Sequence, residues 1–146
     1  MAATTFAAID IGSYEISMKI FEFSKKIGFR ELNDVRYRVE IGKGAYSNGR
    51  LEPEMVDEIC VILGDFSNMM KEFGVTDYRA CATSAFREIV NPVIVQEQIY
   101  QRTGIRIEVL SNAEQHFLGY KSIISFAVLN VIIHNNISTI IYITGI

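Results

Sequence analysis

The fold is decided by the stretch Phe6-Ala7-Ala8-Ile9-Asp10-Ile11-Gly12-Ser13. This short apolar run ends in a carboxylate, a glycine and a hydroxyl, and its length and composition predict a buried strand. An unpartnered buried carboxylate is costly, so we expect Asp10 at the strand end, facing a cation, water or a phosphate. Gly12 allows a tight turn and the close approach of a ligand, and Ser13 adds a hydroxyl and an N–H group. The alternative is an ordinary strand and turn with an Asp cap. The rest of the sequence is needed to choose between these two interpretations.

Composition limits the class of protein. The chain has 146 residues, 49% of them hydrophobic, and a formal net charge of −3. This length fits one domain, or one domain with a fragment of a second. Without a basic excess or a run of Lys and Arg, we expect no nucleic-acid partner. No signal peptide and no apolar run of ~18 residues is present, so we expect no membrane partner and a cytoplasmic location. Cys60 and Cys81 lie in apolar runs and are predicted to be buried free thiols in a reducing compartment.

The first half of the chain predicts a three-stranded meander followed by a helix. Residues 14–23 alternate between apolar and polar positions and form a hairpin with the first strand across Gly12 and Ser13. Residues 29–41 form a third strand, and residues 42–50, rich in glycine, form a loop. A helix opens at Pro53, carries apolar residues at steps of three and four, and ends at Gly74.

The second half alternates strands and helices. Strands are predicted at 77–84 and 105–110. Between them, Asn91 and Pro92 start a helix as cap and first residue. Ser111 and Glu114 fit a capping box before another helix, and residues from about 129 are β-rich. The order β-β-β-α-β-α-β-α therefore predicts an α/β domain with a mixed five-stranded sheet and helices on both faces.

Polar residues cluster where the predicted strands end. Ligands of such sheets bind at the carboxyl ends of the strands. We expect one edge to hold a carboxylate for a hydrated divalent cation, together with hydroxyls, N–H groups and an arginine for phosphate oxygens: Asp10, Ser13, Thr83, Ser84, Arg87 and the helix start at Ser111. The alternative for Arg87 is a surface salt bridge with an acid such as Glu88. His116 and His134 lack a second ligand at suitable spacing and are expected to be surface or capping residues.

Four segments resemble the N-terminal domain of the exopolyphosphatase and guanosine pentaphosphate phosphohydrolase (Ppx/GppA) family. They are residues 8–13, residues 44–51 with the following helix, the A-T-S-A-x-R-x-x-x-N segment at 82–91, and residues 107–111. This family belongs to the actin-like ATPase superfamily, so the resemblance implies a ribonuclease-H-like core. It covers residues 1–128 as one domain, and residues 129–146 are then the crossover and first strands of a truncated second domain.

The resemblance also implies a reaction, a cofactor and residue roles. Members hydrolyse terminal phosphoanhydride bonds of polyphosphate or guanosine pentaphosphate with Mg²⁺. By that resemblance Asp10 faces the metal, and phosphate contacts fall on Gly12, Ser13, Thr83, Ser84 and Arg87. A carboxylate at the start of the third helix activates water in the family, and this region carries Glu114 and Gln115. Because family members often dimerise, a homodimer is a further expectation.

Three departures from the family pattern leave other functions open. Glu15 follows the first loop and would repel an anion unless it faces away. The water-activating position falls on Gln115, which holds water without taking its proton; losing a general base costs roughly 10²–10⁴ in rate. The second phosphate loop is missing before Ile146. We therefore expect the isolated chain to be inactive. The alternatives are a degenerate phosphate- or nucleotide-binding regulatory module and a fragment of an ATP-dependent sugar- or acetate-kinase-like protein.

Overall fold

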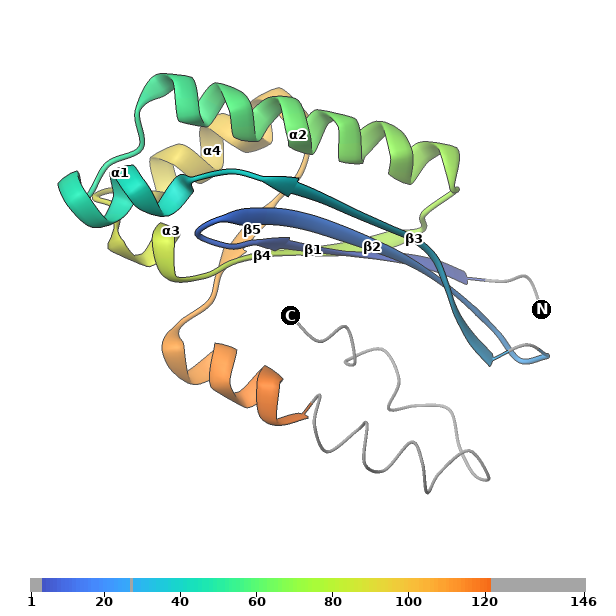
Figure 1. The fold of residues 1–146 in the computed structure, drawn as a ribbon. Coiled ribbons are helices and arrows are strands. Elements are labelled where there is room, and N and C mark those ends of the chain that lie inside the picture. The colour runs from blue at the N-terminus through green and yellow to red at the C-terminus, as the bar shows by residue number, and fades with distance from the viewer. Residues whose placement is uncertain (1–3, 27, 122–146) are drawn as a thin grey trace. The chain divides into compact units, whose positions relative to one another are not determined.

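The structure is a computed structural model that describes residues 4–26 and 28–121 (Figure 1). Contacts between residues divide the chain into two units, Met1–Val109 and Leu110–Ile146. The second unit is described only over residues 110–121, of which 112–121 are helical. The predicted strands after residue 129, His134 and the domain boundary at 128 lie outside the described residues and stay predictions.

The first unit contains the predicted mixed sheet. Its strands are β1 (Thr4–Ile11), β2 (Glu15–Ser24), β3 (Gly28–Arg38), β4 (Asp77–Ala82) and β5 (Ile107–Val109). They lie in the order β3-β2-β1-β4-β5. The first three strands form the antiparallel meander, while β4 runs parallel to β1 and β5 runs parallel to β4. The parallel pairing of β1 with β4 brings the carboxyl ends of these two strands to the same edge.

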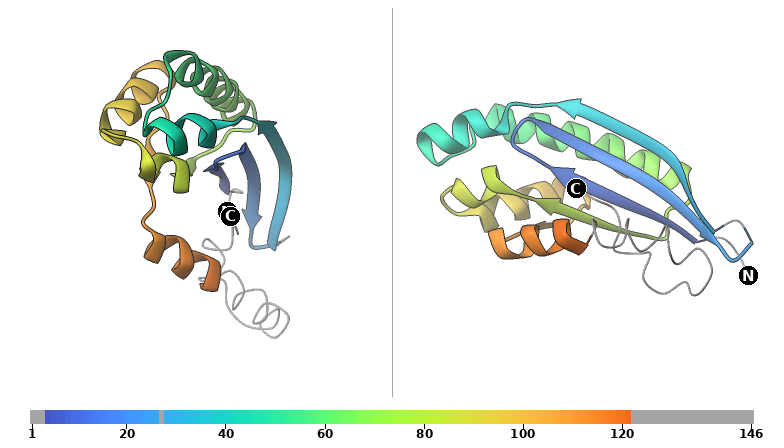
Figure 2. Two further views of the ribbon diagram at one scale, coloured as in Figure 1. Left: turned by 60° about the vertical axis from the view of Figure 1, so that its left-hand side comes forward. Right: turned by 60° about the horizontal axis from the view of Figure 1, so that its bottom comes forward.

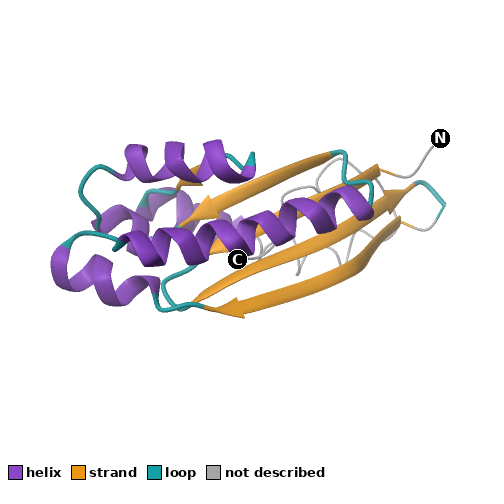
Figure 3. Ribbon diagram, turned by 90° about the horizontal axis from the view of Figure 1, so that it is seen from above, coloured by secondary structure: helices purple, strands orange, loops and turns teal. Residues whose placement is uncertain are grey.

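Four helices complete the first unit: α1 (Ile41–Asn48), α2 (Pro53–Glu72), α3 (Ser84–Glu88) and α4 (Pro92–Thr103). The views in Figures 2 and 3 agree that α2 and α4 cover the same face of the sheet. Figure 1 shows the short helices α1 and α3 at the end of the sheet where β1 turns into β2. Because the helix at 112–121 belongs to the second unit, helices on both faces stay a prediction.

The core lies between the sheet and α2. Ile9 and Ile11 of β1 and Ile16 of β2 are buried in one cluster with Phe66 of α2. Since successive side chains of a strand point to opposite faces, this packing turns Asp10 to the other face of the sheet. The apolar alternation that creates the core therefore also fixes the direction of the first candidate site residue. Cys60 and Cys81 are buried free thiols, as predicted.

The structure corrects three local predictions. Residues 42–50 are predicted as a loop, yet Ile41–Asn48 is helical, and the third strand consequently ends at Arg38 rather than at Ile41. The helix is held by a backbone hydrogen bond from Gly42 N to Ser13 O and by Gly49, whose positive φ of 63° ends it. Tertiary contacts here override the low helix propensity of glycine.

The other two corrections concern the region after β4. The strand ends at Ala82, and Ser84 opens α3 instead of closing the strand. Helix α4 begins at Pro92 as predicted, but the Asn91 side chain makes no capping hydrogen bond. Asn91 is instead left-handed, with φ 59°, which asparagine tolerates better than most residues. Pro92 alone supplies the helix-start signal.

Candidate functional site

The carboxyl ends of β1 and β4 meet as the sequence predicts. In the parallel register Asp10 pairs with Cys81 and Ile11 pairs with Ala82. The pairing continues beyond the strands, because Thr83 N donates to Ile11 O at 3.3 Å. The turn after β1 and the start of α3 are thereby held side by side, although they are about seventy residues apart in the sequence.

Asp10 is the most perturbed carboxyl group of this edge. Its Oδ1 atom is buried and has no hydrogen-bond partner. Burial, and secondarily the negative charge of Glu15, raise the pKa of Asp10 from 3.8 to about 6. A buried acceptor without a partner is uncommon in folded proteins. Oxygen of this kind is what a hydrated Mg²⁺ takes from a protein, commonly through only one or two carboxylates. The residue therefore fits the expected metal, although no group of three His, Cys, Asp or Glu ligands occurs among the described residues.

Glu15 lies close enough to this carboxyl group for its negative charge to act on it. Its charge contributes to the raised pKa of Asp10. Arg36 partly neutralises it, with Nη1 of Arg36 3.5 Å from Oε1 of Glu15, and both side chains are about half exposed. The predicted repulsion of an anion is thus reduced by a neighbouring cation and by solvent screening.

The turn after β1 keeps the space beside Asp10 free of side chain. Gly12 N donates to Glu15 O at 2.9 Å, which closes the turn. A Cβ atom at Gly12 would lie 3.1 Å from Glu15 O and 3.9 Å from Oδ2 of Asp10. Glycine at this position therefore allows both the tight turn and a ligand close to the carboxylate.

Three hydroxyl groups from distant segments converge next to this turn. Ser13 Oγ lies 2.9 Å from Ser84 Oγ, so the two predicted phosphate-binding serines are in direct contact. The hydroxyl of Tyr46 joins them, 2.6 Å from Ser13 Oγ and 2.8 Å from Ser84 Oγ. We call Ser13, Tyr46 and Ser84 the hydroxyl cluster. It connects the β1–β2 turn, α1 and α3.

Sequence reasoning missed Tyr46, because it placed this residue in a loop. The available signal is the spacing of Gly42 and Tyr46, four residues apart and so on one side of a helix. A Cβ atom at position 42 would lie 2.8 Å from Cε2 of Tyr46. The tyrosine ring occupies the space that glycine leaves open.

Thr83 and Arg87 extend the site along α3. Thr83 is buried directly before the helix, and its carbonyl accepts a hydrogen bond from Arg87 N at 3.3 Å. Arg87 is half-buried and lies three residues after Ser84, which places both on the same side of the helix. The predicted residues of the first unit are therefore gathered at one edge: Asp10, Gly12, Ser13, Thr83, Ser84 and Arg87.

Glu114 and Gln115 belong to the second unit and are described separately. Ser111 N and Ser111 Oγ donate to Oε2 of Glu114 at 2.8 and 2.7 Å, and Glu114 N donates to Ser111 Oγ at 3.2 Å. The predicted capping box is thus confirmed. The same bonds occupy one carboxylate oxygen of Glu114, so its proposed role with water competes with its role as a cap.

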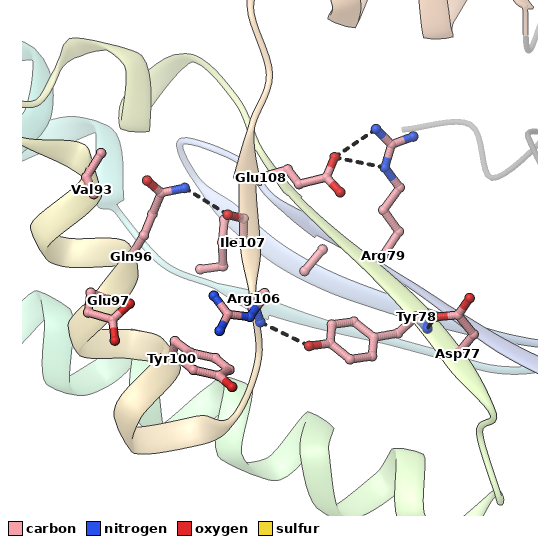
Figure 4. A pocket seen from close by; sticks show the side chains of 11 residues that line it. Asp77, Tyr78, Arg79, Val93, Gln96, Glu97, Tyr100, Arg106, Ile107 and Glu108 are labelled. Carbon is pink, nitrogen blue, oxygen red and sulfur yellow. Dashed lines mark hydrogen bonds and ion pairs between the residues drawn. The ribbon is translucent and has the colours of Figure 1, made fainter.

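The described residues also form a cavity of about 530 Å³ between β4, β5 and α4 (Figure 4). Its polar groups already pair with one another: Arg79 with Glu108, Gln96 with the carbonyl of Ile107, and the guanidinium of Arg106 over the ring of Tyr100 at 3.8 Å. It lies along the amino-terminal half of β4, whereas Asp10 pairs near the other end. The cavity is therefore distinct from the candidate site.

Comparisons with known proteins agree with the arrangement. The model of the Ppx/GppA phosphatase family matches residues 20–132. "Exopolyphosphatase 2" of Mycobacterium tuberculosis is 29% identical over 129 residues, covering 83% of this chain and 40% of that protein. "Exopolyphosphatase 1" of Mycobacterium leprae is 21% identical over 115 residues, covering 79% and 34%. The chain thus spans about 40% of the length of the curated relatives it matches.

Solved structures show the same fold. A Ppx/GppA family member from Aquifex aeolicus superposes with a TM-score of 0.77 at 24% identity, covering 84% of this chain and 40% of that one. An exopolyphosphatase from Cytophaga hutchinsonii gives a TM-score of 0.77 at 23% identity, covering 82% and 38%. The actin-like, ribonuclease-H-like fold is therefore confirmed. In the part of the chain that the structure describes, no helix is both long enough and apolar enough to cross a membrane.

Proposed function

This chain belongs to the Ppx/GppA phosphatase family, and we propose that it forms the phosphate-binding domain of an enzyme that hydrolyses terminal phosphoanhydride bonds of polyphosphate or guanosine pentaphosphate. The observation that carries the proposal is the contact between Ser13 and Ser84 at 2.9 Å. It joins the D-x-G-S and A-T-S-A-x-R segments at the carboxyl ends of two parallel strands, where phosphate ligands bind in sheets of this kind.

The residues divide between the metal and the phosphoryl group. Asp10, with its unpartnered Oδ1, would hold a hydrated Mg²⁺, which when bound neutralises charge on the phosphate oxygens. Ser13 and Ser84 offer hydroxyl donors, and Gly12 keeps the approach open. Arg87 supplies a guanidinium for bidentate contact with phosphate oxygens.

Hydrolysis additionally needs a water molecule aligned with the terminal phosphorus. Attack by this water forms one P–O bond and breaks the bridging P–O bond, releasing phosphate and a shortened chain, while the proton of the water needs an acceptor. Gln115 holds water through its amide but accepts no proton. Glu114 is the neighbouring carboxylate, and its Oε2 is held by Ser111.

Because the hydrogen bonds from Ser111 occupy an oxygen of Glu114, they favour a second candidate function. This is a module that binds the same anions without hydrolysing them. In that case Asp10, Ser13, Ser84 and Arg87 perform binding alone. Phosphate release by the wild type above that of Arg87→Ala supports the hydrolase, and Gln115→Glu tests the binding module. A gain of phosphate release in Gln115→Glu indicates a lost general base, and retained binding with no release indicates the binding module.

The binding claim is tested by calorimetric titration of the chain with long-chain polyphosphate and with guanosine pentaphosphate in Mg²⁺. We expect Arg87→Ala to weaken binding about tenfold or more, because a charge-assisted contact is lost. Arg102→Ala is the matched control, because Arg102 is an exposed arginine paired with Asp57 at 2.6 Å. Equal affinities for the wild type and Arg87→Ala would end the assignment of Arg87. Competition between the two ligands identifies the preferred one.

A further inference from the structure

Tyr46 covers the two serines from the solvent side. Its side chain is 50% exposed, whereas the contact between Ser13 and Ser84 beneath it is partly buried. The phenol oxygen lies within 2.8 Å of both serine oxygens, at 2.6 Å from Ser13 and 2.8 Å from Ser84. These are ordinary O–H···O distances, so the three hydroxyls satisfy one another.

The donor count shows what this arrangement does to an incoming anion. Each hydroxyl has one proton to donate, and three mutual hydrogen bonds use all three protons of the cluster. A phosphoryl group offers only acceptors at this site. A phosphate oxygen therefore gains a hydrogen bond from Ser13 or Ser84 only when a bond inside the cluster is given up.

The tyrosine is the member of the cluster that is free to leave. Ser13 is fixed through its carbonyl, which accepts from Gly42 N at 2.8 Å, and Ser84 follows Thr83, whose N donates to Ile11 O. Tyr46 is held by its hydroxyl and by packing over Gly42. Its exposed ring needs only a side-chain rotation to move into solvent.

We propose that the hydroxyl of Tyr46 occupies the place of a phosphoryl oxygen between Ser13 and Ser84, so that an oxyanion binds by displacing it. This inference rests on the proposed phosphate-binding role of the two serines. It gives Tyr46 an effect opposite in sign to theirs. The serines bind the ligand, whereas the tyrosine competes with it for the same protons.

The test compares three variants of the chain by calorimetric titration with inorganic tripolyphosphate in Mg²⁺. Tyr46→Phe keeps the ring over Gly42 and removes only the competing oxygen, so we expect tripolyphosphate to bind about three- to tenfold more tightly. Ser84→Ala removes a ligand donor, so binding weakens by a similar factor. Tyr100→Phe is the matched control, because it removes the same atom at the cavity by Arg106 and should leave the affinity unchanged.

The signs separate the possible outcomes. A merely structural role of the cluster would make Tyr46→Phe and Ser84→Ala change affinity in the same direction. If the wild type binds and Tyr46→Phe binds equally or less tightly, the displacement proposal is wrong while the phosphate site stands. If neither the wild type nor any variant binds tripolyphosphate, the phosphate site itself is wrong, and the displacement proposal fails with it.

A second readout does not depend on affinity. With 3-fluorotyrosine placed at position 46, displacement moves the ring from the cluster into solvent, and the ¹⁹F resonance shifts as tripolyphosphate is added. We expect this shift to follow the binding isotherm. Saturation with ligand without a change of the resonance would show that Tyr46 stays in place.

Discussion

Asparagine at position 10 should make the protein more stable at neutral and alkaline pH. Oδ1 of the wild-type carboxyl is buried and has no hydrogen-bond partner, and the pKa of Asp10 rises from 3.8 to about 6 on folding. Between these two values the folded state binds more protons than the unfolded state, so stability falls as pH rises through this interval. Above it, the folded protein carries the full cost of an ionised buried group.

The magnitude follows from the same two values. A pKa difference of about two units corresponds to about 3 kcal/mol, since one unit is about 1.4 kcal/mol. Asp10→Asn keeps the shape of the side chain but has no charge. At about pH 8 we therefore expect the variant to be more stable than the wild type by up to about 3 kcal/mol, and at about pH 4 the difference should largely disappear.

Urea denaturation measures the free energy of unfolding of the wild type and the variant at each pH. Circular dichroism suits this measurement because the chain has no tryptophan. Asp57→Asn is the matched control, because Asp57 is an exposed partner of Arg102 and its loss should change stability by less than about 1 kcal/mol at either pH. Added Mg²⁺ should stabilise the wild type at about pH 8 and leave Asp10→Asn unaffected. An Asp10→Asn variant that is less stable than the wild type at alkaline pH would refute the reasoning, because the carboxylate would then have a partner that favours its charge.

Three further predictions concern the scaffold and are measured by the same denaturation. Gly42→Ala should destabilise by less than about 1 kcal/mol, because its Cβ would lie 2.8 Å from the ring of Tyr46 and this ring can rotate into solvent; a loss above about 3 kcal/mol would mean that the ring is fixed in place. Gly64→Ala, inside α2 with free space around it, should stabilise by about 0.5–1 kcal/mol, whereas Gly104→Ala, at φ +74°, should destabilise by about 1 kcal/mol. Equal effects of these two changes would contradict the backbone argument. Phe66→Ala should cost about 3–5 kcal/mol because Phe66 is fully buried in the core, and a loss below about 1 kcal/mol would mean that the core is packed differently.

The parts of the fold that were predictable are those with a clear period. Ile16, Met18 and Ile20 alternate along β2, and all three are fully buried. The long helix α2 follows from apolar steps of three and four between Pro53 and Gly74. In both elements the local sequence pattern agrees with the observed burial, so the sequence alone predicts the element and its buried face.

The parts that were missed are those held by distant partners. Helix α1 contains Gly42 and Gly44 and has little helical preference of its own. What stabilises it is Ser13, about thirty residues earlier, which accepts the hydrogen bond of Gly42 N. The hydroxyl cluster follows from this contact, so Tyr46 was not predictable as a site residue without the tertiary structure.

The position of the candidate site was predictable from the sequence, but its electrostatics were not. Parallel pairing of β1 and β4 follows from the order of elements, and it brings the segments of Asp10 and Ser84 together. The ion pair of Glu15 with Arg36 depends on the register between β2 and β3, which the sequence does not show. The raised pKa of Asp10 depends on burial and on Glu15 together, and only the coordinates supply that combination.

Asp10 differs from the other charged residues on its face of the sheet. Lys19 pairs with Glu31 and Asp34, and Arg79 pairs with Glu108, all at sites partly open to solvent. Among the described residues, only Asp10 carries a buried side-chain oxygen with no hydrogen-bond partner. Asparagine would fit a plain strand end at lower cost, because it carries no charge to desolvate. We propose that a bound cation offsets this cost, and the response of the wild type to Mg²⁺ is therefore the decisive part of the Asp10→Asn experiment.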